Sequence, residues 1–213
     1  MSLKSAGIGA GLITGAAGLT GTVGYATGLF NSNTQITELL KKQNKYALLS
    51  AEANKDAEGW DEAWKKYKKD NETNENGKDK WTVKGWTKQD VPQVPDGFKN
   101  ACSKRKDNKV SGIEDSEYTD FTKYCARPKT VQEILEQENF KPLTGANKET
   151  QWKTKLTTYK VASNQLPNAK INSDAGQERF NELKSGCEAA LKIKTTDDKY
   201  DEILSATRAW CGE

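Results

Sequence analysis

The chain changes character abruptly after its first 30 residues. The 26 residues from Ser5 to Phe30 carry no charge, whereas every formal charge except that of Lys4 lies beyond them. A helix of that length would be about 39 Å long, and the hydrocarbon core of a bilayer is about 30 Å thick. We therefore predict that residues 1–32 form an N-terminal signal anchor, a single transmembrane helix followed by a polar domain.

The alternative for this segment is a cleaved signal peptide. The charged region before the apolar run is short, and no convincing cleavage site of small residues follows the run. An uncleaved anchor therefore fits better. Lys4 favours an N-terminus inside the cell, whereas Lys41, Lys42 and Lys45 compete from the other flank. An even number of cysteines beyond the membrane suits an oxidising exterior, which places the C-terminal domain outside a cell membrane.

Glycines recur at four-residue spacing inside the apolar run. Small residues at this spacing let two transmembrane helices approach closely, and self-association through the anchor is therefore one hypothesis. The other is that glycine and alanine merely dilute a weakly hydrophobic anchor. The candidate helix-packing glycines are Gly7, Gly11, Gly15, Gly24 and Gly28.

Three blocks of sequence recur in the same order along the polar part of the chain. The blocks are Trp60, Trp64 and Tyr67 with Trp152, Leu156 and Tyr159; Phe98–Cys102 with Leu183–Cys187; and Tyr124–Cys125 with Trp210–Cys211. Their offsets are 92, 85 and 86 residues. This pattern indicates a duplicated unit. We predict a first helical repeat over residues 33–139 and a second over residues 140–213, meeting near Phe140.

Each repeat has the pattern of a small helical unit. The i, i+4, i+7 spacing places the aromatic residues on one helix face, and burial in a core is the simpler role for such a stripe. Ser111 with Glu114 and Thr130 with Glu133 fit the capping box at a helix start. Residues 70–80 are predicted to be a polar loop, and only residues 81–83 hint at a strand. The fold class is mainly α.

The four cysteines are Cys102, Cys125, Cys187 and Cys211. Four cysteines allow three disulfide connectivities. The duplication favours Cys102 with Cys125 and Cys187 with Cys211, because each repeat is then self-contained. Loops of about 24 residues would each stabilise the fold by roughly 3 to 4 kcal/mol in the chain-entropy model. Four buried free thiols are the alternative if the domain faces the cytosol.

Several classes of function have little support in the sequence. The chain has no histidine, which removes the usual general base and the commonest zinc ligand. Basic and acidic residues are interspersed, unlike the basic face of a nucleic-acid-binding protein. Residues 72–77 resemble the opening of a calcium loop, but Val83 stands where its bidentate glutamate is needed. We expect no catalytic residues, cofactor, metal or nucleic acid.

The layout of the whole chain resembles a known group of proteins. A Met-Ser start, a Gly/Ala-rich anchor, the spacing of Trp60, Trp64 and Tyr67 and the closing Ala209–Cys211 are similar to the paralogous membrane-anchored proteins of haemotropic mycoplasmas. The resemblance implies surface display on a wall-less bacterium, with antigenic variation or host-cell contact as the role. It implies a host protein or a cell-surface ligand as partner, and no catalytic residues.

Two alternatives to a surface binding or antigenic module are a hydrolase and a structural membrane protein. A membrane-tethered hydrolase without histidine would use carboxylates such as Glu114, Asp115 or Glu133 as acid and base, which requires the fold to bring two of them together. A structural membrane protein would oligomerise through its glycine-rich helix.

Overall fold

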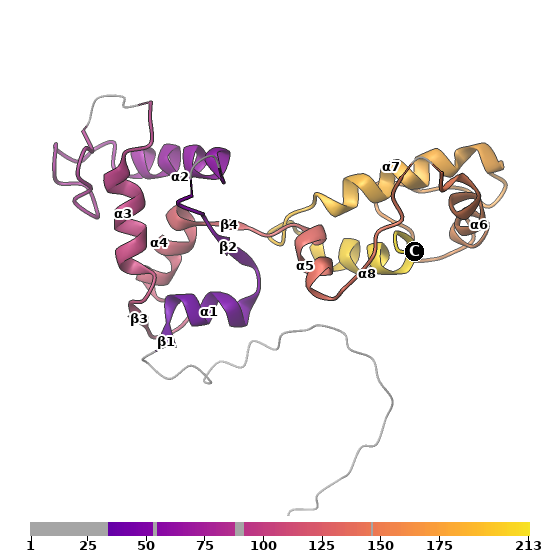
Figure 1. Ribbon diagram of the computed structural model, residues 1–213, viewed down its shortest axis with the longest axis horizontal. Coiled ribbons are helices and arrows are strands. Elements are labelled where there is room, and N and C mark those ends of the chain that lie inside the picture. The colour runs from indigo at the N-terminus through magenta and orange to yellow at the C-terminus, as the bar shows by residue number, and fades with distance from the viewer. Residues whose placement is uncertain (1–33, 53–54, 88–91, 146) are drawn as a thin grey trace, which may run out of the picture.

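The structure, a computed structural model, describes residues 34–52, 55–87, 92–145 and 147–213 (Figure 1). Helices dominate it. They are α1 (Ile36–Gln43), α2 (Ala57–Asp70), α3 (Asp96–Arg105), α4 (Ser116–Cys125), α5 (Val131–Gln137), α6 (Glu149–Tyr159), the 3₁₀-helix η1 (Gln177–Arg179), α7 (Phe180–Leu191) and α8 (Tyr200–Trp210). The four short strands are β1 (Thr34–Gln35), β2 (Tyr46–Leu48), β3 (Lys109–Val110) and β4 (Ala126–Pro128). The predicted mainly α fold class is confirmed.

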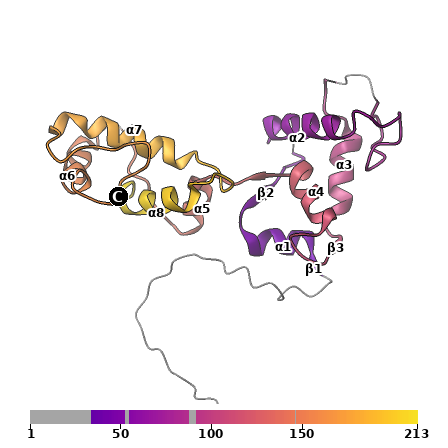
Figure 2. The same ribbon diagram turned by 180° about the vertical axis from the view of Figure 1, so that it is seen from behind.

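Two separate hydrophobic cores divide the described chain into two lobes. One core draws its buried residues from Ile36 to Cys125 and the other from Val131 to Cys211. We call residues 34–125 the first lobe, residues 126–130 the junction and residues 131–213 the second lobe. Figures 1 and 2 show the lobes at opposite ends of the molecule with the junction between them. Helix α5 packs in the second core, so the cores divide before the repeat boundary predicted at residue 140.

The aromatic stripe of α2 lies in the first core, as its spacing predicts. Trp60, Trp64 and Tyr67 are all buried. Helix α2 packs against α4, where the Tyr67 ring meets the Tyr124 ring edge-on at 5.1 Å and 81°. Such edge-to-face contacts add to the stabilisation that burial itself provides.

Helix α6 presents the corresponding stripe to the second core. Trp152, Leu156 and Tyr159 are buried. The Tyr159 ring meets the Trp210 ring edge-on at 5.2 Å and 89°. Trp210 is the residue that the sequence comparison aligns with Tyr124, so one packing arrangement occurs at aligned positions of both lobes.

Backbone pairings also recur between the lobes. In the first lobe β1 pairs with β3, and the Ile36 N–H donates to the Asn108 carbonyl at 3.0 Å. In the second lobe Thr130 bridges Lys194, and the Val131 N–H donates to the Ile193 carbonyl at 2.8 Å. Both bonds fix the first residue of a helix, α1 or α5, against the segment after the third helix of its lobe.

The end of each lobe is closed in a matching way. Strand β2 of the first lobe pairs with β4 of the junction, and the Leu49 N–H donates to the Cys125 carbonyl at 3.0 Å. In the second lobe Pro142 bridges Gly212, and the Leu143 N–H donates to the Cys211 carbonyl at 2.7 Å. The pairing therefore involves the second cysteine of each lobe in both cases.

A buried tyrosine hydroxyl organises the loop after α2 and the loop after α6. The Tyr67 hydroxyl accepts from the Trp81 N–H at 2.9 Å and donates to Asp79 Oδ2 at 2.5 Å. The Tyr159 hydroxyl accepts from the Leu166 N–H at 2.9 Å and donates to the Ala169 carbonyl. Each hydroxyl thereby satisfies a buried backbone donor that no helix or strand partner reaches.

Two local predictions are wrong and one is confirmed. The capping box of Thr130 with Glu133 is present at the start of α5. Ser111 does not cap a helix, because α4 begins at Ser116 with Asp115 as the capping residue, and Ser111 instead donates to the Asp115 carboxylate. Residues 81–83 do not form a strand: Trp81 lies in a turn, and the buried Asp79 carboxylate accepts from the Val83 N–H at 2.8 Å.

The predicted anchor lies outside the described residues. Residues 1–32, with Gly7, Gly11, Gly15, Gly24 and Gly28, belong to the part of the chain that the structure does not describe. In the described part, none of the helices combines the length and the apolar composition that crossing a bilayer requires. The transmembrane helix and its packing glycines stay predictions.

Candidate functional site

The four cysteines form one disulfide in each lobe. Cys102 of α3 is bonded to Cys125 at the end of α4, and Cys187 of α7 is bonded to Cys211 just after α8, with 5.5 Å between the Cα atoms in both pairs. These are the pairs that the comparison of the two sequence repeats favours. Each bond fixes the last two helices of its lobe to one another, and the cysteines that the structure describes are all paired.

A polar network connects the lobes across the junction. The Lys45 carbonyl, just before β2, accepts from the Lys129 N–H of the junction at 2.9 Å and from the Thr195 hydroxyl of the second lobe at 2.5 Å. Arg127 donates to both carboxylate oxygens of Glu133 at 2.7 and 2.9 Å, and to Asp56 Oδ1 at 3.0 Å. Hydrogen bonds from Arg127 are the largest cause of the lowered pKa of Glu133.

The candidate binding site is a cavity in the first lobe between α1, β2 and α4. Its volume is about 190 Å³. Ile113 is the aliphatic residue of its lining. The polar residues of the lining are Gln43, Lys45, Tyr46, Tyr118, Thr119 and Thr122. None of the lining residues described carries a carboxylate, so this cavity can bind acceptor groups without like-charge repulsion.

Tyr118 contributes to the lining of this cavity, but its hydroxyl group is closed off from solvent. Tyr118 is only 4% exposed, and its hydroxyl oxygen is buried without a hydrogen-bond partner in the structure. Burial, followed by the neighbouring Tyr46, raises the pKa of Tyr118 to about 12. The group is therefore a protonated donor at neutral pH, and leaving it unsatisfied costs about 1 to 3 kcal/mol.

A larger and more open hollow of about 510 Å³ lies in the second lobe over the loop of residues 160–173. Val161, 69% exposed, is the most exposed large hydrophobic residue described. The two lysine ammonium groups at this hollow already bind the protein, because Lys160 donates to the Ala175 carbonyl and Lys170 to the Gln165 carbonyl. The hollow thus has fewer donors available for a ligand than its lysines suggest.

The carboxylates considered for the hydrolase alternative lie outside the two cavities, and two of them have structural roles. Glu133 closes the capping box of α5 and binds Arg127, while Asp115 caps α4 and accepts from the Glu117 N–H at 2.9 Å. Glu114 is exposed. Neither of the two cavities above includes any of the three in its lining. The hydrolase alternative stays a prediction without support from these positions.

One other sequence feature, a formal glycosylation sequon, is explained by the structure. Asn71, which begins a formal glycosylation sequon, is 1% exposed, and its side-chain amide donates to the Tyr67 carbonyl at 2.8 Å. This side chain is therefore a structural part of the loop. Among the described residues, no group of three or more histidine, cysteine, aspartate or glutamate side chains could hold a metal ion.

Sequence reasoning missed the cavity residues Gln43, Tyr118 and Thr122. The repeat alignment carries a signal for them, because the 86-residue offset of the last cysteines places Thr122 opposite Arg208 and Tyr118 opposite Leu204. A change from an aliphatic or charged residue to a hydroxyl at aligned positions marks a place where the lobes differ in chemistry.

The comparisons with known proteins add no relative to this description. Neither the protein-family models, nor the curated proteins, nor the solved structures contain a match to the chain.

Proposed function

We propose that the chain is a surface protein held in the cell membrane by residues 1–32, and that its two lobes are diverged copies of one helical unit that bind an extracellular partner. A host protein or a cell-surface ligand is the partner that this role implies. The observation that carries the proposal is the presence of a disulfide at matching positions of both lobes. Disulfides persist in oxidising surroundings and are rare in the cytosol.

The paired hydrogen bonds support the proposal of two copies. Helix starts, lobe ends, the buried tyrosines and the edge-on ring contacts all recur at aligned positions. Chance could produce one such matching contact. The same order of helices with the same long-range hydrogen bonds favours duplication followed by divergence.

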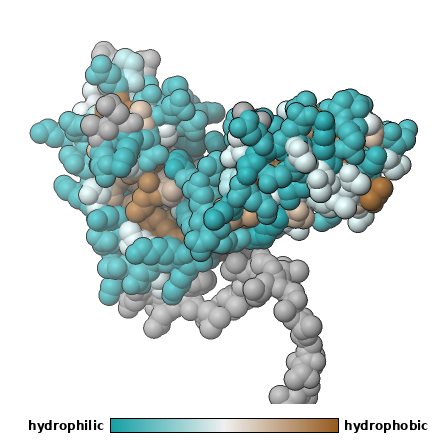
Figure 3. All heavy atoms as spheres, turned by 45° about the vertical axis from the view of Figure 1, so that its right-hand side comes forward, coloured by the Kyte–Doolittle hydropathy of each residue, from teal (hydrophilic) through white to brown (hydrophobic). Residues whose placement is uncertain are grey.

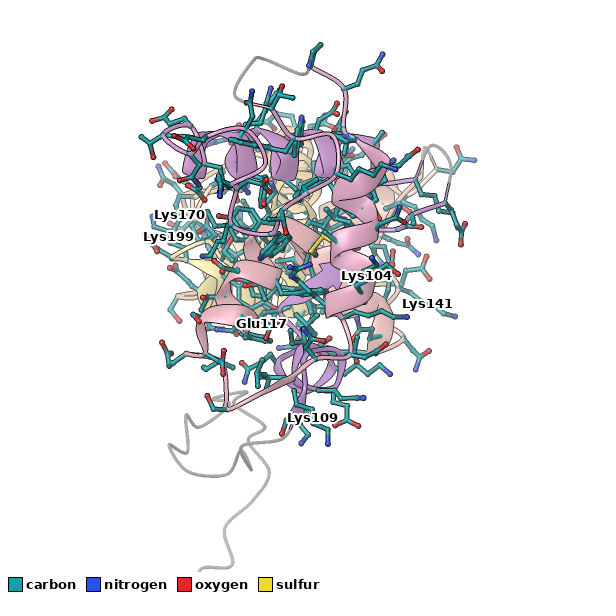
Figure 4. All side chains as sticks on the ribbon, turned by 90° about the vertical axis from the view of Figure 1, so that its left-hand side faces the viewer. Lys104, Lys109, Glu117, Lys141, Lys170 and Lys199 are labelled. Carbon is teal, nitrogen blue, oxygen red and sulfur yellow. A yellow bond between two sulfur atoms is a disulfide. The ribbon has the colours of Figure 1, made fainter. Side chains whose placement is uncertain are left out.

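The surface supports a role in contact with another molecule. Figure 3 shows a largely hydrophilic surface that is broken by an apolar patch on the first lobe, next to the second lobe. Charged side chains project from the ribbon on all sides in Figure 4, where Lys109 marks the end of the first lobe at β3. Dense mixed charge keeps such a domain soluble, and an apolar patch on that background offers a contact area.

Protease shaving of intact cells that express the full chain tests the proposed display. Trypsin added to sealed cells should remove the antibody signal of the lobes while a cytosolic marker survives. In the same samples, a maleimide polymer should shift the protein on a gel only after reduction, because both pairs of cysteines are bonded. Survival of the lobes under trypsin, together with a shift without reductant, would contradict the proposal.

A further inference from the structure

The loop after α2 in the first lobe contains an asparagine followed by a glycine in an exposed turn. The turn runs from Glu75 to Lys78, and the Lys78 N–H donates to the Glu75 carbonyl at 2.9 Å. Gly77 has a φ of 72°, which suits the third residue of a type II turn and favours glycine there. All four residues of the turn except Gly77 carry side chains, and all four are exposed. Asn76–Gly77 is the only Asn-Gly pair in the sequence.

An asparagine followed by glycine can react with its own backbone. The nitrogen of the next residue attacks the side-chain carbonyl carbon, and because both groups belong to one chain, no second molecule has to be captured. A side chain on the next residue hinders this approach, and glycine has none. The backbone must also rearrange to bring the nitrogen onto the carbon. The turn leaves room for this, because a Cβ atom built on Gly77 would meet nothing within 4 Å outside its chain neighbours.

The pair Asp96–Gly97 shows what the turn contributes. Aspartate before glycine can form the same cyclic imide, with water in place of ammonia as the leaving group. These two residues begin α3, however, and a Cβ atom at Gly97 would lie 2.0 Å from the Lys84 carbonyl oxygen. The backbone at Gly97 is therefore held in a helix and packed against another segment, which leaves it no room to rearrange.

The other two asparagines of the loop also differ from Asn76. Asn71 is 1% exposed, and its side-chain oxygen accepts from the Lys80 N–H at 2.7 Å. The side-chain amide of Asn74 donates to that same oxygen at 2.9 Å. Each of the two is followed by glutamate rather than glycine. Sequence and structure thus both single out Asn76 within this loop.

We propose that Asn76 is a site of spontaneous deamidation. The Gly77 nitrogen bonds to Cγ of Asn76, and the side-chain amide leaves as ammonia with the proton that the Gly77 nitrogen gives up. Water then opens the five-membered imide. Breaking the bond from the Gly77 nitrogen to Cγ gives aspartate, and breaking its bond to the backbone carbonyl carbon gives isoaspartate. Either product is about 1 Da heavier and carries one more negative charge at neutral pH.

The reaction changes the surface of the first lobe and leaves its core intact. The bond between Asn71 and the Lys80 N–H closes the base of the loop, and the bonds of the Tyr67 hydroxyl to Asp79 and Trp81 lie beyond the turn. The modified chain should therefore keep the melting temperature of the fresh chain. The proposal goes beyond the proposed function and does not rest on it, since the only co-reactant is water.

The test ages the full chain, folded in detergent micelles at neutral pH, and follows it by mass spectrometry. Trypsin releases residues 70–78 as one peptide with all three asparagines of the loop. Electron-transfer fragmentation then assigns the mass gain to a residue and distinguishes isoaspartate from aspartate. The gain at Asn76 should exceed that at Asn71 or Asn74 more than tenfold. A freshly purified sample, digested alongside, corrects for reaction during digestion. No gain at Asn76 beyond that sample, or a comparable gain at Asn74, would overturn the proposal.

An unfolded sample separates the contribution of the structure from that of the sequence. The reduced chain in guanidinium chloride should form isoaspartate at both Asn76 and Asp96, and the folded chain at Asn76 alone. Equal isoaspartate at Asp96 in the folded and unfolded chains would contradict the role given to packing at Gly97. Asn76→Gln, which would have to form a larger ring, is the matched variant. It should lose the mass gain of the peptide and keep the melting temperature, and a gain that persists in this variant would also overturn the proposal.

Discussion

The loops after α2 and α6 differ in length, yet in both lobes a buried tyrosine hydroxyl binds the loop backbone. In the first lobe the Tyr67 hydroxyl accepts from a backbone N–H 14 residues later, and in the second the Tyr159 hydroxyl accepts from one 7 residues later. The longer loop supplies a buried carboxylate, Asp79, where the shorter one uses the Ala169 carbonyl. The hydrogen bond to tyrosine is kept while the loop around it differs.

The same contrast holds at the cavity. Both lobes keep the disulfide, the ring contact and the strand pairing at the end of the last helix. They differ at the three positions of Gln43, Tyr118 and Thr122. What the lobes share is therefore the set of contacts that holds their four α-helices together, and specific function is to be sought where they differ.

The largest expected effect comes from removing one disulfide at a time. Replacing Cys102 and Cys125 by alanine, or Cys187 and Cys211 by alanine, opens loops with separations of 23 and 24 residues. The chain-entropy model gives about 3.5 kcal/mol for either loop. Hydrogen exchange read by mass spectrometry should show lost protection in the altered lobe and retained protection in the other. Equal loss in both lobes would show that the two cores unfold as one unit.

Replacing the buried tyrosine should destabilise the two lobes to different extents, because the hydrogen-bond partners of Tyr67 and Tyr159 differ in charge. Tyr67→Phe leaves the Trp81 N–H without a partner and leaves the buried Asp79 carboxylate with the hydrogen bond from the Val83 N–H alone. Tyr159→Phe leaves only neutral backbone groups unpaired. We expect a loss of about 3 kcal/mol in the first lobe and about 2 kcal/mol in the second, since a hydrogen bond to a charged group contributes more than one between neutral groups. Urea denaturation measures both, and a larger loss in the second lobe would contradict the role given to Asp79.

Gly186 offers a sharper test of packing in the second lobe. A Cβ atom at Gly186 would lie 2.4 Å from the Cβ of Ala169, whereas the aligned position of the first lobe holds the buried Ala101. Gly186→Ala should cost about 1 to 2 kcal/mol through overpacking, despite its better helix propensity. Adding Ala169→Gly should restore most of the loss in thermal unfolding. If the single variant is more stable than the parent, α7 and the loop are less tightly packed than the structure shows.

Much of this fold could be predicted from the sequence because its signals are local or repeated. The stripes of α2 and α6, the capping box at Thr130 and the pairing of the cysteines each follow from spacing within one lobe or between the two. The start of α4 could not be predicted in this way. Ser111 and Asp115 both suit a helix cap, and the choice between them depends on β3, whose pairing with β1 spans most of the lobe.

The cavity could not be predicted for a similar reason. Gln43, Tyr118 and Thr122 lie on two helices far apart in sequence, and their types occur commonly on exposed faces. Only the repeat alignment connects Tyr118 and Thr122 to Leu204 and Arg208, and only the structure shows that these two residues line a hollow in the first lobe. Positions that differ between two internal repeats are therefore best examined together where they are neighbours in the structure, rather than one at a time.

The smallest expected effect concerns the ion pair that joins the lobes, and its pH dependence has a defined sign. The pKa of Glu133 is lowered in the folded chain, mainly by hydrogen bonds from Arg127. Its stabilisation is thus fully present above the ordinary value of 4.5, and it is lost as the pH falls below that value through the lowered pKa. Both side chains are about one third exposed, so the ion pair contributes about 1 kcal/mol to stability.

Glu133→Gln should lose less stability than the parent between pH 6 and pH 3 in urea denaturation. Glu138→Gln, which breaks the more exposed pair with Arg208 inside the second lobe, is the matched control. If the two variants respond to acid alike, Glu133 contributes no more to stability than an ordinary surface carboxylate.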